Sequence, residues 1–320
     1  MTPASLPTLR LAMLGMIPGN GHPYSWSAII NGYDPAAMAS CPYPVIPVYL
    51  GKQPLESVRI PGAQVTHLWT DDPAEALSVA KASLIPNVVP RMEEVIGHVD
   101  AAIIGTDDGT DHVRRARPFI EAGLPVFIDK PLATTREELA QFIAWKRAGA
   151  RIFSSSGLRY SPEHRELRGK PWRWITSTTA KSWERYGIHA LESAAVLTGP
   201  GFGEVRCDAK DGDVIATITH RSGTLLTVAV LPDAPASFGH LHAYGNDTAQ
   251  HVQLSDTYAA FRGQMVSIVE WLRSGREPFP FEETVELMAV LIAGIESRET
   301  GCRVPVARVL EEVHSMAAAL

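Results

Sequence analysis

Short apolar runs alternate with helical segments through the first half of the chain, and this alternation constrains the fold more than any other feature. Apolar runs bounded by glycine or polar residues are typical of buried strands, whereas apolar residues spaced three or four apart are typical of helices. Strands that alternate with helices form a parallel, doubly wound sheet with right-handed crossovers. The predicted strands are Leu9–Leu14, Val45–Leu50, Gln64–Trp69, Val99–Gly105, Pro125–Asp129 and Arg151–Ser154, and the helices are Ser25–Asn31, Asp72–Ala82, Arg91–Ile96, His112–Ala122 and Thr135–Ala148.

The pattern changes after residue 155, where strands follow one another with short turns, as in an antiparallel sheet. Ser222-Gly223 predicts a hairpin turn. We therefore expect an α/β chain with a dinucleotide-binding Rossmann domain over residues 1–155. Residues 156–320 should form an α+β domain with a mainly antiparallel, open sheet. Its predicted strands are Trp172–Lys181, Glu204–Ala209, Val214–His220, Thr224–Leu231, His240–Tyr244 and His251–Leu254, and its helices are Ile188–Leu197, Phe261–Ser274 and Phe281–Arg298.

Composition excludes several classes of function. The chain has a net charge of −6 and no long basic run, so nucleic acid is not an expected partner. Its apolar runs are shorter than the roughly 20 residues of a membrane span, and Met1–Arg10 lacks the apolar core of a signal peptide. Three scattered cysteines argue against a disulfide framework. We expect a cytoplasmic protein.

The turn after the first strand, Gly15–His22, is rich in glycine. Ligands of open α/β sheets bind beyond the carboxyl ends of the strands, and glycines there let backbone N–H groups approach a pyrophosphate. The spacing is G-x-x-x-G-x-G, however, and Pro18 removes one donor, so an ordinary turn remains an alternative. If the turn binds phosphate, the contacts come from Gly15, Ile17, Gly19, Asn20 and Gly21.

A second dinucleotide signal is missing at the expected place. A strand that grips an NAD ribose should end in an acidic residue, yet the predicted strand Val45–Leu50 is followed by Gly51-Lys52. Lys52 could meet the 2′-phosphate of NADP or be a solvated surface charge. The choice between NAD and NADP stays open.

The turn after the fifth strand is the most informative. Asp129-Lys130-Pro131 places a lysine directly after an apolar strand. An ammonium there can hydrogen-bond a substrate hydroxyl and favour alkoxide character, although a simple capping turn would have the same local sequence.

The segment Ile120–Ala133, read as EAGLPVFIDKPLA from Glu121, resembles the EAGK-x-VF-x-EKPLA signature of the Gfo/Idh/MocA family (glucose–fructose oxidoreductase/inositol dehydrogenase). Gly294–Val306 is similar to the family's closing helix and tail. The resemblance implies an enzyme that uses NAD or NADP to transfer a hydride to or from a sugar, inositol or related polyol. It also implies a homodimer or homotetramer.

The same resemblance assigns residues in the first domain. Lys130 matches the catalytic lysine, and with Asp129 it is expected at the cofactor. Thr106, Asp107 and Asp108 occupy the turn where the family carries a TPN-like sequence near the nicotinamide, although the proline is absent here and the turn is acidic.

In the second domain, His189 matches the family's proton-accepting histidine, and Glu192, one helical turn on, could orient its ring. Four residues before His189 the family commonly has aspartate, but this chain has Arg185, which could bind a substrate carboxylate. Arg159, Arg185, Tyr186 and Glu192 are thus the expected substrate contacts. No third ligand joins His240 and His242, so no metal site is expected.

Three functions compete at this point. The first is a dehydrogenase or reductase, in which Lys130 and His189 frame a secondary alcohol. The second is a lyase or glycosidase that retains its NAD, and the altered residue at position 185 motivates it. The third is a binding protein without catalytic activity, which the irregular glycine turn allows.

Overall fold

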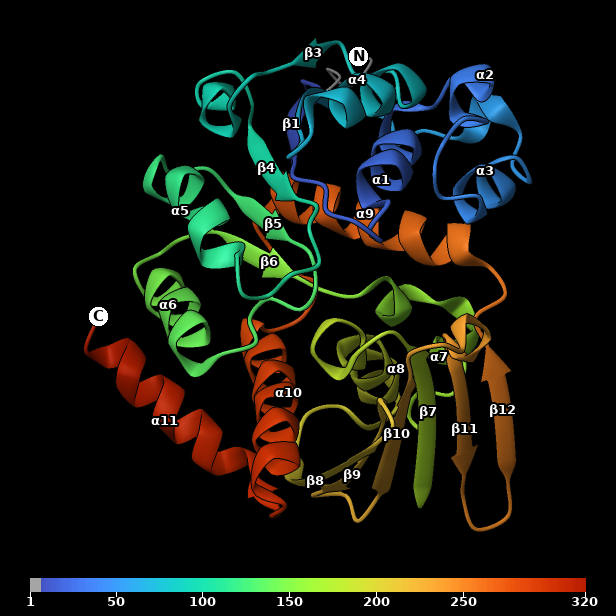
Figure 1. The fold of residues 1–320 in the computed structure, drawn as a ribbon, viewed down its shortest axis with the longest axis vertical. Helices are drawn as coiled ribbons and strands as arrows, with labels where there is room; N and C mark the ends of the chain where they lie inside the picture. Colours follow the sequence, from blue (N-terminus) through green and yellow to red (C-terminus); the bar gives the residue numbers. More distant parts are fainter. Residues whose placement is uncertain (1–6) are drawn as a thin grey trace, which may run out of the picture.

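The computed structural model describes residues 7–320, so part of the segment Met1–Arg10 lies outside the described residues. Its first sheet has six parallel strands in the order β3-β2-β1-β4-β5-β6 (Figure 1). This is the Rossmann order, with its switch point between β1 and β4, and it confirms the predicted fold of the first half. The strands are β1 (Leu9–Leu14), β2 (Ala63–Trp69), β3 (Asn87–Val88), β4 (Ala101–Ile104), β5 (Val126–Ile128) and β6 (Ile152–Ser154).

The helices of this half begin at residues that satisfy their free N–H groups. Asp72 accepts a hydrogen bond from the N–H of Ala74, and Thr135 accepts one from Glu138. Both helices were predicted within one residue of their observed bounds. The helices are α1 (His22–Asn31), α4 (Pro73–Ala82), α5 (His112–Glu121) and α6 (Arg136–Arg147), with a 3₁₀ turn at η2 (Met92–Val95).

The prediction of a strand at Val45–Leu50 was wrong, because this segment is the helix α3 (Val45–Leu50). Its buried side chains, Ile46, Tyr49 and Leu50, are three and four residues apart, whereas Val45 and Val48 stay exposed. That spacing is helical. With α2 (Pro35–Met38) and η1 (Leu55–Ser57), α3 forms an insert between α1 and β2.

The second sheet has seven strands in the order β12-β11-β7-β10-β9-β8-β13. Neighbours run antiparallel except β7 and β10, which are parallel, and β9 and β10 are joined through the predicted turn at Ser222-Gly223. The mainly antiparallel sheet is therefore confirmed. Its strands are β7 (Trp174–Ala180), β8 (Phe202–Lys210), β9 (Asp213–His220), β10 (Leu225–Leu231), β11 (His240–Tyr244), β12 (Ala249–Gln253) and β13 (Val304–Pro305).

Three longer helices follow or cover this sheet: α8 (Ile188–Thr198), α9 (Thr257–Ser274) and α10 (Phe281–Thr300). Shorter turns are η3 (Gly157–Tyr160), α7 (Pro162–Arg165), η4 (Trp183–Gly187) and η5 (Pro235–Ser237). Helices α8 and α10 pack on one face of the sheet, but α9 returns to the first sheet and packs against α1 (Figure 1). No helix within residues 7–320 is long and apolar enough to span a membrane.

A last helix, α11 (Val306–Ala318), was not predicted. It buries Val306, Val309, Val313 and Ala317 and packs against α6 of the first half. Helices α9, α10 and α11 thus all contact the Rossmann side. We keep residues 155/156 as the proposed domain boundary along the chain.

Candidate active site

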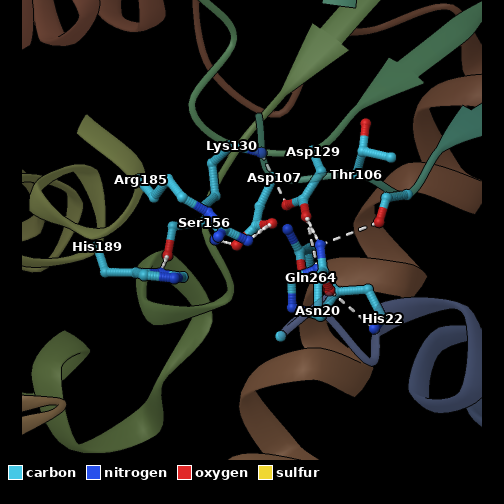
Figure 2. A network of polar contacts seen from close by, with 12 residues as sticks. Asn20, His22, Thr106, Asp107, Asp129, Lys130, Ser156, Arg185, His189 and Gln264 are labelled. Atoms are coloured by element: carbon cyan, nitrogen blue, oxygen red, sulfur yellow. Dashed lines mark hydrogen bonds and ion pairs between the residues drawn. The ribbon is translucent and has the colours of Figure 1, made fainter. Parts of the chain in front are cut away.

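The turns after β1, β4 and β5 meet at one edge of the parallel sheet, and the segment from β7 to α8 faces them (Figure 2). Parallel strands bring their carboxyl ends to the same edge. Lys130 comes from the turn after β5, Asp107 from the turn after β4, and Arg185 and His189 from the second half of the chain (Figure 2). The predicted catalytic residues are therefore assembled from both halves.

Lys130 lies at the centre of this group and is only 2% exposed. Its Nζ is 3.6 Å from Oδ2 of Asp107 and 4.5 Å from the centre of the Tyr186 ring. Burial disfavours the ammonium, but the carboxylates of Asp129 and Asp107 outweigh it and raise the pKa of Lys130 above its ordinary value. The side chain is therefore a cation at neutral pH, and its Nζ has no hydrogen-bond partner within residues 7–320.

Asp107 is shared between two cations. Its Oδ1 accepts a hydrogen bond of 2.5 Å from Nη2 of Arg185, and its Oδ2 faces Lys130. Burial opposes ionisation of Asp107, yet Lys130 and Arg185 hold its pKa well below the ordinary range. Arg185 is thus bound to a carboxylate of the protein itself, from the facing turn.

His189 is 3% exposed and lies against the rings of Tyr186 and Phe238. Its Nδ1 is 2.7 Å from Oγ of Ser156. Ser156 can therefore accept a hydrogen bond from Nδ1–H, which leaves Nε2 unprotonated and able to act as a base. Burial and the nearby charge of Lys130 lower the pKa of His189 well below 6.5. The sequence reasoning missed Ser156, although its place directly after β6 marks it as an edge residue of the same sheet.

Arg159 and Glu192 lie behind Ser156. One carboxylate oxygen of Glu192 accepts the backbone N–H of Ser156 at 3.2 Å, and the other is paired with Nε of Arg159. Nη1 of Arg159 donates to Glu283 at 2.8 Å. Glu192 therefore contacts the residue that holds His189 and is linked to the ring through Ser156.

Asp129 joins the first and third turns. It is fully buried and is contacted by Nδ2 of Asn20 at 3.2 Å and by Nδ1 of His22 at 2.6 Å. Asn20 also donates to the carbonyl of Gly105 at 3.0 Å (Figure 2). Asn20 and Asp129 thus set the position of the glycine turn relative to Lys130.

The predicted glycines have different roles. Gly15 and Gly19 have φ of +86° and +82°, which glycine adopts without strain. A Cβ on Gly21 would come within 2.7 Å of Tyr43 and Ile46, so this glycine makes room for the insert that carries α3. Ile17 is half-buried between them.

The acidic residue that the ribose signal requires is present after all. The second strand is β2, and it is followed by Thr70 and Asp71. Asp71 accepts the backbone N–H of Met16 at 3.1 Å and is paired with Nη2 of Arg115 at 2.7 Å. The prediction missed Asp71 because it placed the second strand at residues 45–50. That segment is a helix, so Lys52 follows a helix instead of a strand.

Two residues of the β4 turn differ in environment. Thr106 is buried, and its Oγ1 has no partner within the described chain. Asp108 instead accepts hydrogen bonds from the backbone and hydroxyl of Thr110. The structure brings Thr106 and Asp107 to the centre of the site and leaves Asp108 at its edge. Within residues 7–320, no three acidic, histidine or cysteine side chains could together hold a metal ion.

Residues 46–155 match the Gfo/Idh/MocA family, described as an oxidoreductase family with an NAD-binding Rossmann fold. The matched segment lies within the Rossmann half of the chain. Two curated relatives also match about a third of this chain: inositol 2-dehydrogenase 3 of Saccharopolyspora erythraea is 30% identical over 112 residues, and inositol 2-dehydrogenase of Acidothermus cellulolyticus is 31% identical over 118 residues. The matched stretches cover 34% and 36% of this chain and 33% and 34% of those relatives.

Solved structures extend the likeness in fold to nearly the whole of this chain. Scyllo-inositol dehydrogenase from Lactobacillus casei, solved with NAD(H) and scyllo-inositol, superposes with a TM-score of 0.70 at 15% identity, covering 94% of this chain and 99% of that one. A myo-inositol dehydrogenase from Corynebacterium glutamicum gives a TM-score of 0.69 at 17% identity, covering 93% and 98%. The second domain thus shares the fold of these structures as well.

Proposed function

We propose that this chain is an NAD-dependent dehydrogenase that oxidises a secondary hydroxyl of a neutral polyol such as an inositol or a sugar. One observation carries the proposal: Nζ of Lys130, Oδ2 of Asp107 and Oγ1 of Thr106 are all buried without a hydrogen-bond partner in the described chain. Buried polar groups are rarely left unpaired. A hydroxyl group, which both donates and accepts, can satisfy a neighbouring ammonium and carboxylate at once.

The residues present also fit a dinucleotide. Gly15 and Gly19 hold left-handed backbone at the start of α1, and Asp71 stands after β2, where a carboxylate binds the adenosine ribose in Rossmann folds. When bound there, the nicotinamide would accept the hydride from the alcohol carbon.

Side chains of the protein accept the hydroxyl proton and stabilise the charge on the reacting oxygen. Lys130, kept cationic by its two carboxylate neighbours, stabilises the negative charge that develops on the reacting oxygen. His189, kept neutral by burial, accepts the hydroxyl proton at Nε2 while Ser156 holds Nδ1. Tyr186 contacts both Lys130 and His189 and fixes their separation.

The charged side chains of the site balance one another, and this balance favours a neutral substrate. Lys130 and Arg185 face Asp107 and Asp129, so the four charges cancel. Arg185, which could have bound a substrate carboxylate, is already paired with Asp107. A carboxylated sugar would have to compete with that pair.

Asp71 supports NAD over NADP. A 2′-phosphate beside Asp71 would face a like charge, and Arg115 is already paired with Asp71 and Asp111. We take NAD as the cofactor and small neutral polyols as the substrates. The cytoplasmic location and the homodimer or homotetramer remain part of this proposal.

The test is a rate measurement at 340 nm with NAD⁺ and a panel of polyols. We expect turnover with myo-inositol, scyllo-inositol or a neutral aldose, and slower turnover with gluconate or glucuronate. Faster turnover of the acids would show that Arg185 binds a carboxylate. Product formation without any change at 340 nm and without added cofactor would replace the proposal with the lyase or glycosidase. Failure to bind either dinucleotide would leave a binding protein.

A further inference from the structure

The glycine turn after β1 offers few backbone donors to a pyrophosphate. Pro18 and Pro23 have no N–H group. The N–H groups of Met16 and His22 already donate to side chains, of Asp71 and Asn20 respectively. The turn therefore has fewer free N–H donors than one without these prolines and side-chain contacts.

A cation from the second domain lies against this turn. Lys181 directly follows β7, and its Nζ donates a hydrogen bond of 2.7 Å to the carbonyl of Gly19. An ammonium has three donors, so two remain for another acceptor. Unlike Arg185, Lys181 forms no ion pair with a carboxylate within residues 7–320.

The backbone of Lys181 supports a functional reading. Its φ is +60°, in the left-handed region that lysine seldom adopts. Such conformations cost of order 1 kcal/mol or more and are concentrated at ligand sites. The side chain packs over the Tyr186 ring at 4.1 Å, on the same ring that Lys130 contacts. Backbone and ring together direct the ammonium toward Gly19.

We propose that Lys181 binds the pyrophosphate of the dinucleotide, so that a cation of the substrate domain replaces backbone donors that the glycine turn lacks. The proposal rests on the proposed function and assigns a binding role to a residue outside the Rossmann half of the chain. Because Lys181 already contacts Gly19, its ammonium is in place beside the glycine turn before a dinucleotide binds.

Two variants of Lys181 distinguish the effect of its charge from the effect of its left-handed backbone. Asn tolerates left-handed backbone better than most residues, so Lys181→Asn removes the charge and retains the turn, whereas Lys181→Arg retains the charge. NADH binding is followed by energy transfer from tryptophan, and adenosine, which lacks phosphate, serves as the control ligand. We expect Lys181→Asn to weaken NADH binding by about tenfold or more, to leave adenosine binding unchanged, and to leave Tm unchanged or higher. Lys181→Arg should bind NADH within about threefold of the parent.

The outcomes distinguish this inference from the proposed function. If the parent chain binds NADH and Lys181→Asn binds it equally well, Lys181 has no role at the pyrophosphate, and the dehydrogenase proposal stands. An equal loss of NADH and adenosine binding would also overturn the inference, because it would show a general disturbance of the site. If the parent chain binds no dinucleotide, both proposals fail together.

Discussion

Arg185 and Asp107 form a direct link between the two halves of the chain: Nη2 of Arg185 donates to Oδ1 of Asp107 at 2.5 Å. Asp107 is 1% exposed, whereas the Arg185 side chain is about one-third exposed. The same carboxylate faces Lys130. The pair therefore joins the two halves of the chain and sets the charge next to Lys130, the proposed catalytic lysine.

Breaking this pair should destabilise the fold. Arg185→Ala leaves Asp107 with Lys130 as its only cation, and we expect the free energy of unfolding to fall by about 2 kcal/mol. Asp107→Asn together with Arg185→Ala should cost less than the sum of the single changes, because the uncompensated charge is gone. Urea denaturation of the four proteins measures the coupling. Strict additivity would show that the two side chains do not interact in solution.

Removing the ammonium of Lys130 should affect turnover far more than binding. Lys130→Ala should lower kcat by roughly 10²–10³-fold, the loss typical of a group that stabilises charge in the transition state. The dissociation constant for NADH, measured by fluorescence on the same preparation, should stay nearly unchanged. A variant that retains the parent's turnover would remove Lys130 from the mechanism.

The lowered pKa of His189 predicts how activity depends on pH. Because burial and Lys130 hold its pKa well below 6.5, the imidazole stays neutral and able to accept a proton as pH falls through 6.5. The kcat/KM for alcohol oxidation should therefore stay flat across that value and fall only at lower pH. An inflection at the ordinary histidine pKa, lost in His189→Gln, would contradict this assignment.

The same shift makes the fold less stable in acid. The unfolded chain binds a proton to His189 at about 6.5, and the folded chain resists it, so stability declines as pH falls below the unfolded pKa. His189→Gln should lessen that decline. Chemical denaturation at several pH values, on the parent and the variant, measures the difference.

Asp71 should decide between the two dinucleotides. Asp71→Ser removes the charge that opposes a 2′-phosphate and frees Arg115 to meet it. We expect the ratio of NADPH to NADH dissociation constants to fall by about tenfold or more. Asp72→Ser is the matched control, since Asp72 caps α4 through the N–H of Ala74, serine can replace it in that role, and the dinucleotide preference should stay unchanged. Equal ratios in the two variants would argue against Asp71.

Local sequence was sufficient for most of the fold. The apolar runs after residues 8, 100 and 125 were correctly predicted as buried strands, and their alternation with helices indicated the parallel sheet. The place of Lys130 was also predictable, because a side chain directly after a buried strand of a parallel sheet lies at the edge where ligands bind. The segment Val45–Leu50 was predicted wrongly as a strand, because a short apolar run fits the period of a strand as well as that of a helix until its buried neighbours are known.

The sequence by itself thus determined five of the six strands of the Rossmann sheet, and its resemblance to a known family singled out Lys130 and His189 as candidate catalytic residues. Only the tertiary structure decided the partners of these groups: Asp107 for Arg185, Ser156 for His189, and the glycine turn for Lys181. These contacts join residues 33 to 162 positions apart. Local propensity carries no information about such pairs, because they arise from the crossing of chain segments when two sheets pack their edges around one site.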